Sequence, residues 1–486
     1  MLPEALICLL NVALAFAQTQ QALPLNALAS FTPSNTPKPP VLSLPTSSNL
    51  SVTVALCSSG NNPRFFVTNS SDAIPGSSGG KSVFEITLKD GYGNWTGPFR
   101  DGGVLAIEDV GQSSFELGVS EQGPIHEILP NLPLLGDTTS NQALLFSPAF
   151  AISQNDKPTY PNYTLPPANA SLPEPPSDIP NFTLFVSPTS SLTPLPQSGC
   201  MLSSQNSTGT VVNQSLWLKD KQGWRTQWLL EALTPATNYT AYVVKDRTKV
   251  SGPINFVTKS ATFACPLVFG LPYCPNVAYT VPLPPPTGAG SNTYTAANIP
   301  AEITTPLLSY LTNFTTSLTS FACGRDWYSP LVGCDDCQRE YRRWLCSITF
   351  TRCGEPSPAN PDSFTRSLPA PTATGLSALQ PKDKNNPTAP QKVFSALIPQ
   401  ASDISKARSP NLPAMGSQYS MLLPCIEICT AVDRACPSLV GFTCPTVQFN
   451  AAASYGVGYT DSADGDEGQG VTGGPQDRWG NIWCNG

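Results

Sequence analysis

Cysteines are the residues of this chain with the clearest capacity for chemistry. Five of them fall between Cys323 and Cys353, and the segment from Leu422 to Cys444 carries four more. The pair Cys334-x-x-Cys337 has the spacing of half a zinc site, which needs reduced thiols and a second matching pair. In an oxidising compartment the same thiols form disulfide bonds. Of these two chemistries we expect the disulfides, with no metal ligand and no cofactor.

The first residues indicate which compartment applies. Residues 1–17 contain an apolar core too short to span a bilayer, and Ala15-Phe16-Ala17 fits a cleavage site. We interpret them as a secretory signal peptide, the alternative being a buried N-terminal helix. Cleavage removes Cys8 and leaves 14 of the 15 cysteines, an even number. The cysteines that we expect in disulfide bonds are Cys57, Cys200, Cys265, Cys274, Cys323, Cys334, Cys337, Cys346, Cys353, Cys425, Cys429, Cys436, Cys444 and Cys484.

Residue types suited to catalysis are scarce. His126 is the only histidine, so a Ser–His–Asp or Cys–His arrangement would depend on it, and no nucleophile motif lies nearby. We expect His126 in a surface loop. The paired carboxylates of a glycosidase cannot be recognised by spacing alone, and the acidic run from Asp461 to Glu467 lacks the ligand spacing of an EF-hand. We predict that the protein is not an enzyme.

The net charge and the glycosylation sequons limit the kinds of partner that we expect. The formal net charge is −7 and only 12% of residues are charged, which argues against nucleic acid. Ten Asn-x-Ser/Thr sequons all precede Cys323, so the segment after it is a candidate sugar-free docking face. The expected glycosylation sites are Asn49, Asn69, Asn94, Asn162, Asn169, Asn181, Asn206, Asn213, Asn238 and Asn313.

The elements that must position these residues form a multi-domain chain. Its fold class is a β-sandwich-type N-terminal region plus an α-helical, disulfide-rich C-terminal domain. Pro-, Ser- and Thr-rich residues 18–48 are expected to be a disordered lead-in. Short alternating runs predict a β-sandwich-like domain over 49–152, followed by a proline-rich linker at 153–180. Residues 181–260 form a second β segment, in which the run from Leu233 to Val243 resembles the tyrosine corner of a fibronectin type III module.

A proline-rich connector spans residues 261–302, and residues 261–301 carry no charge. Its prolines would break a lipid-facing helix, so we expect a covered extended segment closed by Cys265 and Cys274 instead of a membrane span.

Residues 303–486 form the expected cysteine-rich domain, with a disordered insertion at 354–413. Helical spacing places Cys337, Tyr341 and Trp344 on one stripe, and places Cys425, Cys429 and Cys436 on another. Two helices with cysteines on their buried faces predict a pair held together by disulfide bonds.

The cysteine motifs carry a resemblance. CDDCQREYRRWLCSITFTRC followed by LLPCIEICTAVDRACP resembles the C-terminal domain of the fungal stretch-activated calcium-influx subunits. These are accessory partners of a four-repeat, voltage-gated-type cation channel pore subunit, and their animal relatives serve the sodium-leak channel. The spacing of Cys425, Cys429 and Cys436 is also similar to the frizzled cysteine-rich domain. The resemblance implies calcium influx at the plasma membrane, passage through the endoplasmic reticulum, and membrane association through the pore subunit.

Aromatic and arginine side chains are the candidate partner contacts, because both types are enriched at interface anchors. They are Trp327, Tyr328, Arg339, Arg342 and Arg343. The alternative function is a secreted ligand-binding glycoprotein, a cell-wall or lipid binder with a frizzled-like groove. A self-sufficient channel is the third possibility.

Overall fold

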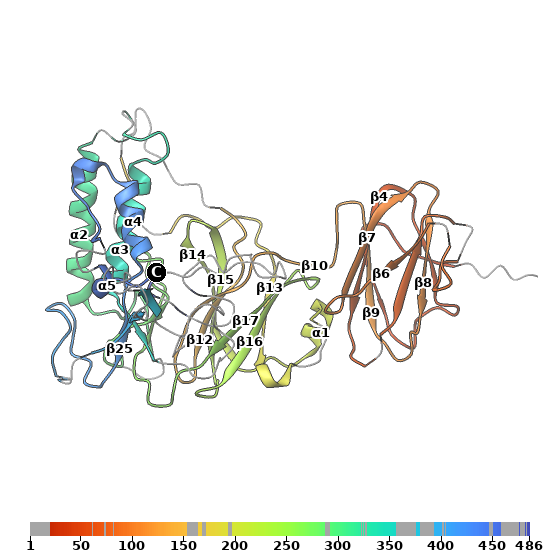
Figure 1. The fold of residues 1–486 in the computed structure, drawn as a ribbon, viewed down its shortest axis with the longest axis horizontal. Coiled ribbons are helices and arrows are strands. Elements are labelled where there is room, and N and C mark those ends of the chain that lie inside the picture. Colours follow the sequence, from red (N-terminus) through yellow and green to blue (C-terminus); the bar gives the residue numbers. More distant parts are fainter. Residues whose placement is uncertain are drawn as a thin grey trace, which may run out of the picture. The chain divides into compact units, whose positions relative to one another are not determined.

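A computed structural model describes most of the chain (Figure 1). It describes residues 20–486 except 61, 72–73, 81, 153–163, 168–171, 193–196, 287–291, 322, 324, 326–327, 356–375, 380–392, 401–402, 404, 447–450, 458–475, 477–481 and 483. The expected signal peptide and the acidic run from Asp461 to Glu467 lie outside the described residues. The chain divides into two compact units, residues 1–127 with 195–201, and residues 128–194 with 202–486.

The first unit is built from two sheets. The five-stranded sheet has the order β1-β3-β8-β5-β6, with bounds Gln21–Ala22, Val41–Leu44, Gly103–Glu108, Arg64–Thr68 and Val83–Ile86. The four-stranded sheet has the order β2-β9-β4-β7, with bounds Ala27–Phe31, Phe115–Ser120, Ser47–Leu56 and Tyr92–Phe99. Alternating apolar residues on these strands point into one core, which is the pattern of a sandwich.

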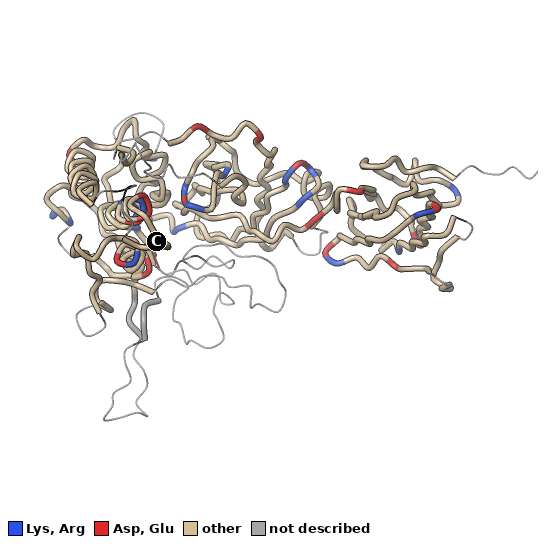
Figure 2. The backbone as a smooth tube through the Cα atoms, turned by 90° about the horizontal axis from the view of Figure 1, so that it is seen from above, with Lys and Arg blue, Asp and Glu red and all other residues tan. Residues whose placement is uncertain are grey.

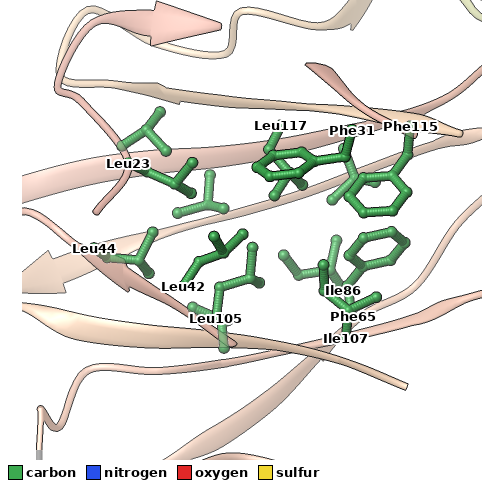
Figure 3. Close-up of a cluster of buried hydrophobic side chains, with 14 of the residues drawn as sticks. Leu23, Phe31, Leu42, Leu44, Phe65, Ile86, Leu105, Ile107, Phe115 and Leu117 are labelled. Atoms are coloured by element: carbon green, nitrogen blue, oxygen red, sulfur yellow. The ribbon is translucent and has the colours of Figure 1, made fainter. Parts of the chain in front are cut away.

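Aromatic and aliphatic side chains fill this core (Figure 3). Phe115 is fully buried and contacts two rings, with centroids 5.3 Å from Phe31 and 5.3 Å from Phe65. Burying a side chain of this size stabilises the fold by roughly 1.5–3 kcal/mol.

The expectation of a disordered lead-in at 18–48 is wrong for the described residues. Strands β1, β2 and β3 lie there, and Leu23, Phe31 and Leu42 are buried in the core. Each strand is short, and β2 and β3 pair with β9 and β8, far along the chain. A local pattern could not reveal such pairing.

The second unit contains another pair of four-stranded sheets. One has the order β10-β17-β16-β13, with bounds Glu127–Ile128, Lys249–Val257, Asn238–Lys245 and Phe182–Pro188. The other has the order β11-β12-β15-β14, with bounds Leu134–Thr138, Ala143–Phe146, Gly223–Glu231 and Thr210–Asp220. Strands β11 and β12 come from the range in which we expected the first β domain, but β12 pairs with β15 and β11 pairs with β12, so both belong to this sheet. The short helices η1 and α1 span Thr189–Ser191 and Gly199–Ser204.

The tyrosine corner expected from the sequence is present. The backbone N–H of Thr234 donates a hydrogen bond to Tyr239 Oη at 2.9 Å, and the ring stacks on Phe256 with centroids 5.6 Å apart. Tyr239 lies at the start of β16, so the hydrogen bond fixes the loop that enters the strand.

The uncharged connector is buried, as expected. It forms the small strands β18 Leu267–Val268, β19 Tyr279–Thr280 and β20 Thr293–Tyr294. Its side chains pack against helices α2 (Ala301–Thr319) and α3 (Cys334–Thr349) in one hydrophobic cluster with Leu307 and Leu345. In the described part of the chain, no helix has both the length and the apolarity needed to cross a bilayer.

Our expectation that Cys265 and Cys274 close the connector on itself is wrong. Cys265 bonds to Cys353, and Cys274 bonds to Cys346. The extended connector keeps the two cysteines apart, and each meets a cysteine of the region that covers it.

The helical region follows the connector. Its helices are α2 Ala301–Thr319, α3 Cys334–Thr349, α4 Ile426–Ala435, η2 Ser438–Val440 and α5 Ala451–Ser454. A small sheet has the order β21-β25-β24, with bounds Arg352–Gly354, Ser420–Leu422 and Leu397–Pro399. Strands β22 Leu376–Leu379 and β23 Val393–Ser395 pair with each other.

The expected disordered insertion at 354–413 is wrong at its C-terminal end. Strand β24 pairs with β25, Leu412 is buried against the connector, and Arg408 donates to the carbonyl oxygens of Ile348 and Thr349. Residues 356–375 and 380–392 lie outside the described residues.

A buried carboxylate joins three parts of the second unit. Asp137 on β11 is fully buried and accepts hydrogen bonds from the N–H and hydroxyl of Thr280 at 3.1 and 2.8 Å. Lys259 Nζ lies 3.5 Å from its other oxygen. Charged residues are sparse along the described chain, as Figure 2 shows, so this buried group stands out among them.

Candidate docking surface

Helix α3 is fixed by its first turn and by its cysteines. The N–H of Gly333, which precedes the helix, donates to Asp336 Oδ2 at 2.9 Å. Asp335 and Asp336 therefore lie where the positive end of the helix dipole favours carboxylates. Cys337 and Cys346 are fully buried, so the helix is held on more than one side.

The expectation that the cysteines form disulfide bonds is confirmed. The bonds are Cys57–Cys200, Cys265–Cys353, Cys274–Cys346, Cys323–Cys334, Cys337–Cys436, Cys425–Cys484 and Cys429–Cys444. Only Cys337–Cys436 joins α3 to the end of α4, so the predicted stitching of the two helices rests on one bond. Because α4 runs from Ile426 to Ala435, Cys425 and Cys436 lie just outside it, and the expected second stripe is helical only in part.

Aromatic rings pack along one side of α3. Tyr341 stacks on Phe314 of α2 with centroids 3.6 Å apart, and Trp344 meets Phe442 edge-on at 4.9 Å. The indole N–H of Trp344 donates to Tyr455 Oη at 3.1 Å. These half-buried rings hold α2, α3 and the segment after α4 together.

The three arginines of α3 differ in their partners. Arg339 Nη2 lies 2.7 Å from Asp336 Oδ1 and 3.2 Å from Glu340 Oε1, so its charge is already compensated within the helix. Arg342 and Arg343 are half-buried, and neither guanidinium has an ion pair or hydrogen bond with another described residue. Burial lowers the pKa of Arg342 from its ordinary value. These two arginines are the ones that remain available to a partner.

Of the two aromatic residues predicted to contact a partner, only Tyr328 lies among the described residues. Tyr328 is half-buried and its hydroxyl donates to the carbonyl oxygen of Ala435 at 2.7 Å. Burial raises the pKa of the Tyr328 hydroxyl, since the phenolate would be poorly solvated. Tyr328 therefore tethers the loop before α3 to the end of α4. Trp327 lies outside the described residues.

Two exposed leucines were not anticipated from the sequence. Leu331 is 89% exposed and Leu439 is 83% exposed. Leu331 is three residues before α3, and Leu439 follows α4, so the Tyr328–Ala435 hydrogen bond and the Cys337–Cys436 bond tie their loops to the same end of the helix pair. The signal in the sequence was a repeated Leu-Val-Gly, at 331–333 and 439–441. We call Leu331 and Leu439 the leucine tip.

The expected surface position of His126 is wrong. The imidazole is buried, with Nδ1 2.9 Å from Thr53 Oγ1 and Nε2 3.5 Å from Glu116 Oε2. This hydroxyl–imidazole–carboxylate order is that of an acyl-transfer triad. However, Thr53 is fully buried inside its sheet and its hydroxyl donates to Gly118 O, so no substrate can reach it. The three residues serve the sandwich core.

Metal-ligating chemistry has little support in the described residues. Two groups bring potential ligands together, Cys57 and Cys200 with Glu116, and Cys425 and Cys484 with Glu427. Each cysteine in them is disulfide-bonded and cannot act as a thiolate ligand. The zinc alternative for Cys334 and Cys337 fails for the same reason.

Similarity to known proteins places the chain in the class of fungal cation channel components. A protein named stretch-activated cation channel MID1 from Cryptococcus neoformans var. grubii is 34% identical, covering 92% of this chain and 81% of that protein. Stretch-activated cation channel yam8 from Schizosaccharomyces pombe is 25% identical, covering 58% and 52%. The protein named stretch-activated cation channel MID1 from Saccharomyces cerevisiae is 28% identical, covering 44% and 34%.

The family model Mid1, described as a stretch-activated Ca2+-permeable channel component, matches residues 47–471. The chain belongs to the Mid1 family, and the resemblance inferred from its cysteine motifs is confirmed. Its role is associated with calcium influx through a channel. Among solved structures, a glycoside hydrolase domain (Endo-D) from Streptococcus pneumoniae R6 aligns over 46% of this chain at 11% identity, with a TM-score of 0.16 that is too low to indicate a common fold.

Proposed function

We propose that this chain is a non-enzymatic accessory subunit whose helical, cysteine-rich region docks on the extracellular face of a four-repeat cation channel pore subunit. It passes through the endoplasmic reticulum and is retained at the plasma membrane by that partner. The observation that carries the proposal is the leucine tip, two bare leucines on loops locked to one end of a disulfide-bonded helix pair.

The leucine tip gives the docking a driving force. Burying a leucine side chain fully is worth roughly 1.5–3 kcal/mol, and both leucines are more than 80% exposed in the isolated chain. The disulfide bond and the Tyr328 tether restrict the loops before binding, which lowers the entropy lost on association. No sequon follows Cys323, so no N-linked glycan would obstruct the tip.

Arg342 and Arg343 add an electrostatic component. Both guanidinium groups are half-buried and without a described ionic partner, so part of their desolvation cost is already met in the free chain. A carboxylate on the partner would then bind them with less loss than a fully hydrated pair. We therefore expect an acidic extracellular loop on the pore subunit.

We also propose that residues 303–486 are frizzled-like and that the domain ranges expected from the sequence apply. Cys425, Cys429 and Cys436 keep the frizzled spacing along α4 and its ends. Their bonds run to Cys484, Cys444 and Cys337, so one short helix anchors three separate segments. Such a scaffold is suited to presenting loops to a partner.

The test is calcium accumulation, together with co-purification of the pore subunit, in cells that lack their own subunit. Leu331→Ser with Leu439→Ser should reduce both by at least fivefold while the protein is secreted normally. Arg342→Glu with Arg343→Glu should also reduce both. The matched control is Ile152→Ser, because Ile152 is 77% exposed and lies outside the helical region.

The outcomes separate the competing functions. If wild-type protein restores uptake but both double variants do so equally well, the docking surface lies elsewhere on the chain. If wild-type protein never restores uptake and never co-purifies with a channel, the secreted ligand-binding glycoprotein replaces the subunit proposal. Cys425→Ser serves as the folding reference, because it should abolish uptake together with secretion.

A further inference from the structure

The two sandwiches each end in a strand whose outer side has no described strand partner, apart from the bridge between Lys89 and Tyr92 at the first residue of β7. Strand β7 is last in the order β2-β9-β4-β7, and β14 is last in the order β11-β12-β15-β14. An open edge strand presents unpaired N–H and C=O groups to which another chain can pair. Both strands are long for an edge, with eight residues in β7 and eleven in β14.

The first half of β14 is the more open of the two. Residues 210–214 are exposed, including the neighbouring Val211 at 45% and Val212 at 49%. Successive strand residues point to opposite faces, so both faces are bare there. Further along, Trp217 is buried and donates its indole N–H to Pro275 O at 2.9 Å, so only the first half is uncovered.

All of β7 and the first nine residues of β14 lack the charges that usually protect an edge, and Lys219 and Asp220 lie only at the far end of β14. No charged residue occurs between Asp90 and Arg100 around β7, or between Asp178 and Lys219 before and along β14. Lysine and other charged side chains are the common protection against edge-to-edge pairing. The bulge between Val211 and Asn213 is one remaining protective feature of β14.

Sequons occupy the positions where the charges are missing. Asn94 is the third residue of β7 and Asn213 the fourth of β14, and both side chains are exposed. Each lies in register with the inner strand, Asn94 opposite Thr53 and Asn213 opposite Leu229. Asn206, also exposed, provides a further sequon four residues before β14. By contrast, Asn238 on the inner strand β16 is only half-exposed.

We propose that N-linked glycans on Asn94 and Asn213 cap the open edges of the two sandwiches and keep the chain from pairing with a second copy through them. A pairing strand must come within about 4.7–4.9 Å of the edge. A branched, hydrated oligosaccharide in the middle of the strand occupies that space. The glycans thus replace the charged side chains that these edges lack. The proposal requires only passage through the secretory pathway and is independent of which partner the helical region binds.

The test uses the full-length chain secreted from glycosylating eukaryotic cells. Peptide mass analysis after enzymatic glycan release first establishes occupancy of Asn94 and Asn213. Size-exclusion chromatography with light scattering then measures the oligomer fraction of N94Q, of N213Q and of the double variant. The control is N313Q, which removes an exposed sequon from helix α2 and touches no strand edge.

We expect at least a fivefold higher oligomer fraction in the double variant than in wild type, and no increase in N313Q. Val212→Lys in the N213Q background should return the protein to monomer, because a charge then protects the same edge. That rescue would not occur if N213Q acted through misfolding. Vacant sites, an equal increase in N313Q, no increase in the double variant, or failure of Val212→Lys to rescue would each overturn the proposal.

Discussion

Arg352 Nε lies 2.9 Å from Asp137 Oδ2, although the two residues are 215 positions apart in the sequence. Arg352 also donates to the carbonyl oxygen of Gly136, and its guanidinium lies over the ring of Tyr279. The ion pair joins the sandwich strand β11 to β21 of the helical region, with the connector between them. Substituting one of these two residues therefore tests how much the stability of the second unit depends on this connection.

Removing the carboxylate should destabilise the unit strongly. In Asp137→Asn, Arg352 and Lys259 keep their charges but lose the anion between them. Leaving a buried charge uncompensated costs about 3–5 kcal/mol. We expect a clear drop in the melting temperature of the purified protein. Asp403→Asn, which breaks the exposed pair with Lys406, should leave it unchanged.

The same pair predicts a dependence on pH. Burial alone raises the pKa of Asp137, but the charges of Arg352 and Lys259 outweigh it and lower the pKa from 3.8 to about 2. Because the folded pKa is the lower one, the stabilisation is complete above about pH 4 and is lost as the pH falls towards 2. It amounts to roughly 2 kcal/mol. Between pH 5 and pH 2 the stability of the wild-type protein should fall by this amount in addition to any other loss, and the stability of Asp137→Asn should not show this additional fall. Melting curves measure both, and an identical pH dependence in the two proteins would contradict the assignment.

The tyrosine corner predicts a smaller effect. Tyr239→Phe keeps the ring against Phe256 and removes only the hydroxyl that accepts from the Thr234 N–H. One hydrogen bond of this kind contributes about 0.5–1.5 kcal/mol. Denaturant unfolding should show that loss. Tyr310→Phe, on an exposed helical tyrosine, is the control and should show none.

The insertion divides into a part that can be replaced and a part that cannot. We expect a Gly-Ser linker in place of 356–395 to leave secretion intact, because β22 and β23 pair only with each other among the described strands. Replacing 354–413 should block secretion, since it removes β24, Leu412 and Arg408 from the packed region. Secretion of both variants, measured by immunoblot of the medium, would show that these contacts are dispensable.

The sequence predicted the features that depend on local spacing. The stripe through Cys337, Tyr341 and Trp344 corresponds to α3, and the run around Tyr239 predicted its hydrogen bond to the chain just upstream. The even number of cysteines and the oxidising compartment predicted that disulfide bonds form. They did not predict that Cys265 bonds to Cys353. Which cysteines pair depends on which segments meet in three dimensions, and the spacing of cysteines along the sequence does not reveal this.

The misses have a common physical cause. Leu42 reads as one apolar residue in a proline-rich lead-in, yet it pairs with Leu105 across the sheet. His126 reads as a loop residue, yet Thr53 and Glu116 enclose it. Leu331 and Leu439 show the reverse error, because leucines are expected inside and these two are exposed. In each case a distant segment decides the environment of the side chain.

The bond between Cys337 and Cys436 has a consequence for processing of the chain. It is the only one of the seven disulfides that crosses the peptide segment from 354 to 424. A protease that cuts within this segment would therefore produce a two-chain molecule with a single covalent link. The two fragments would migrate together on a gel until a reducing agent is added. Maturation by cleavage is thus compatible with an intact helix pair, and within this segment the part from 356 to 395 is the one whose length is free to vary.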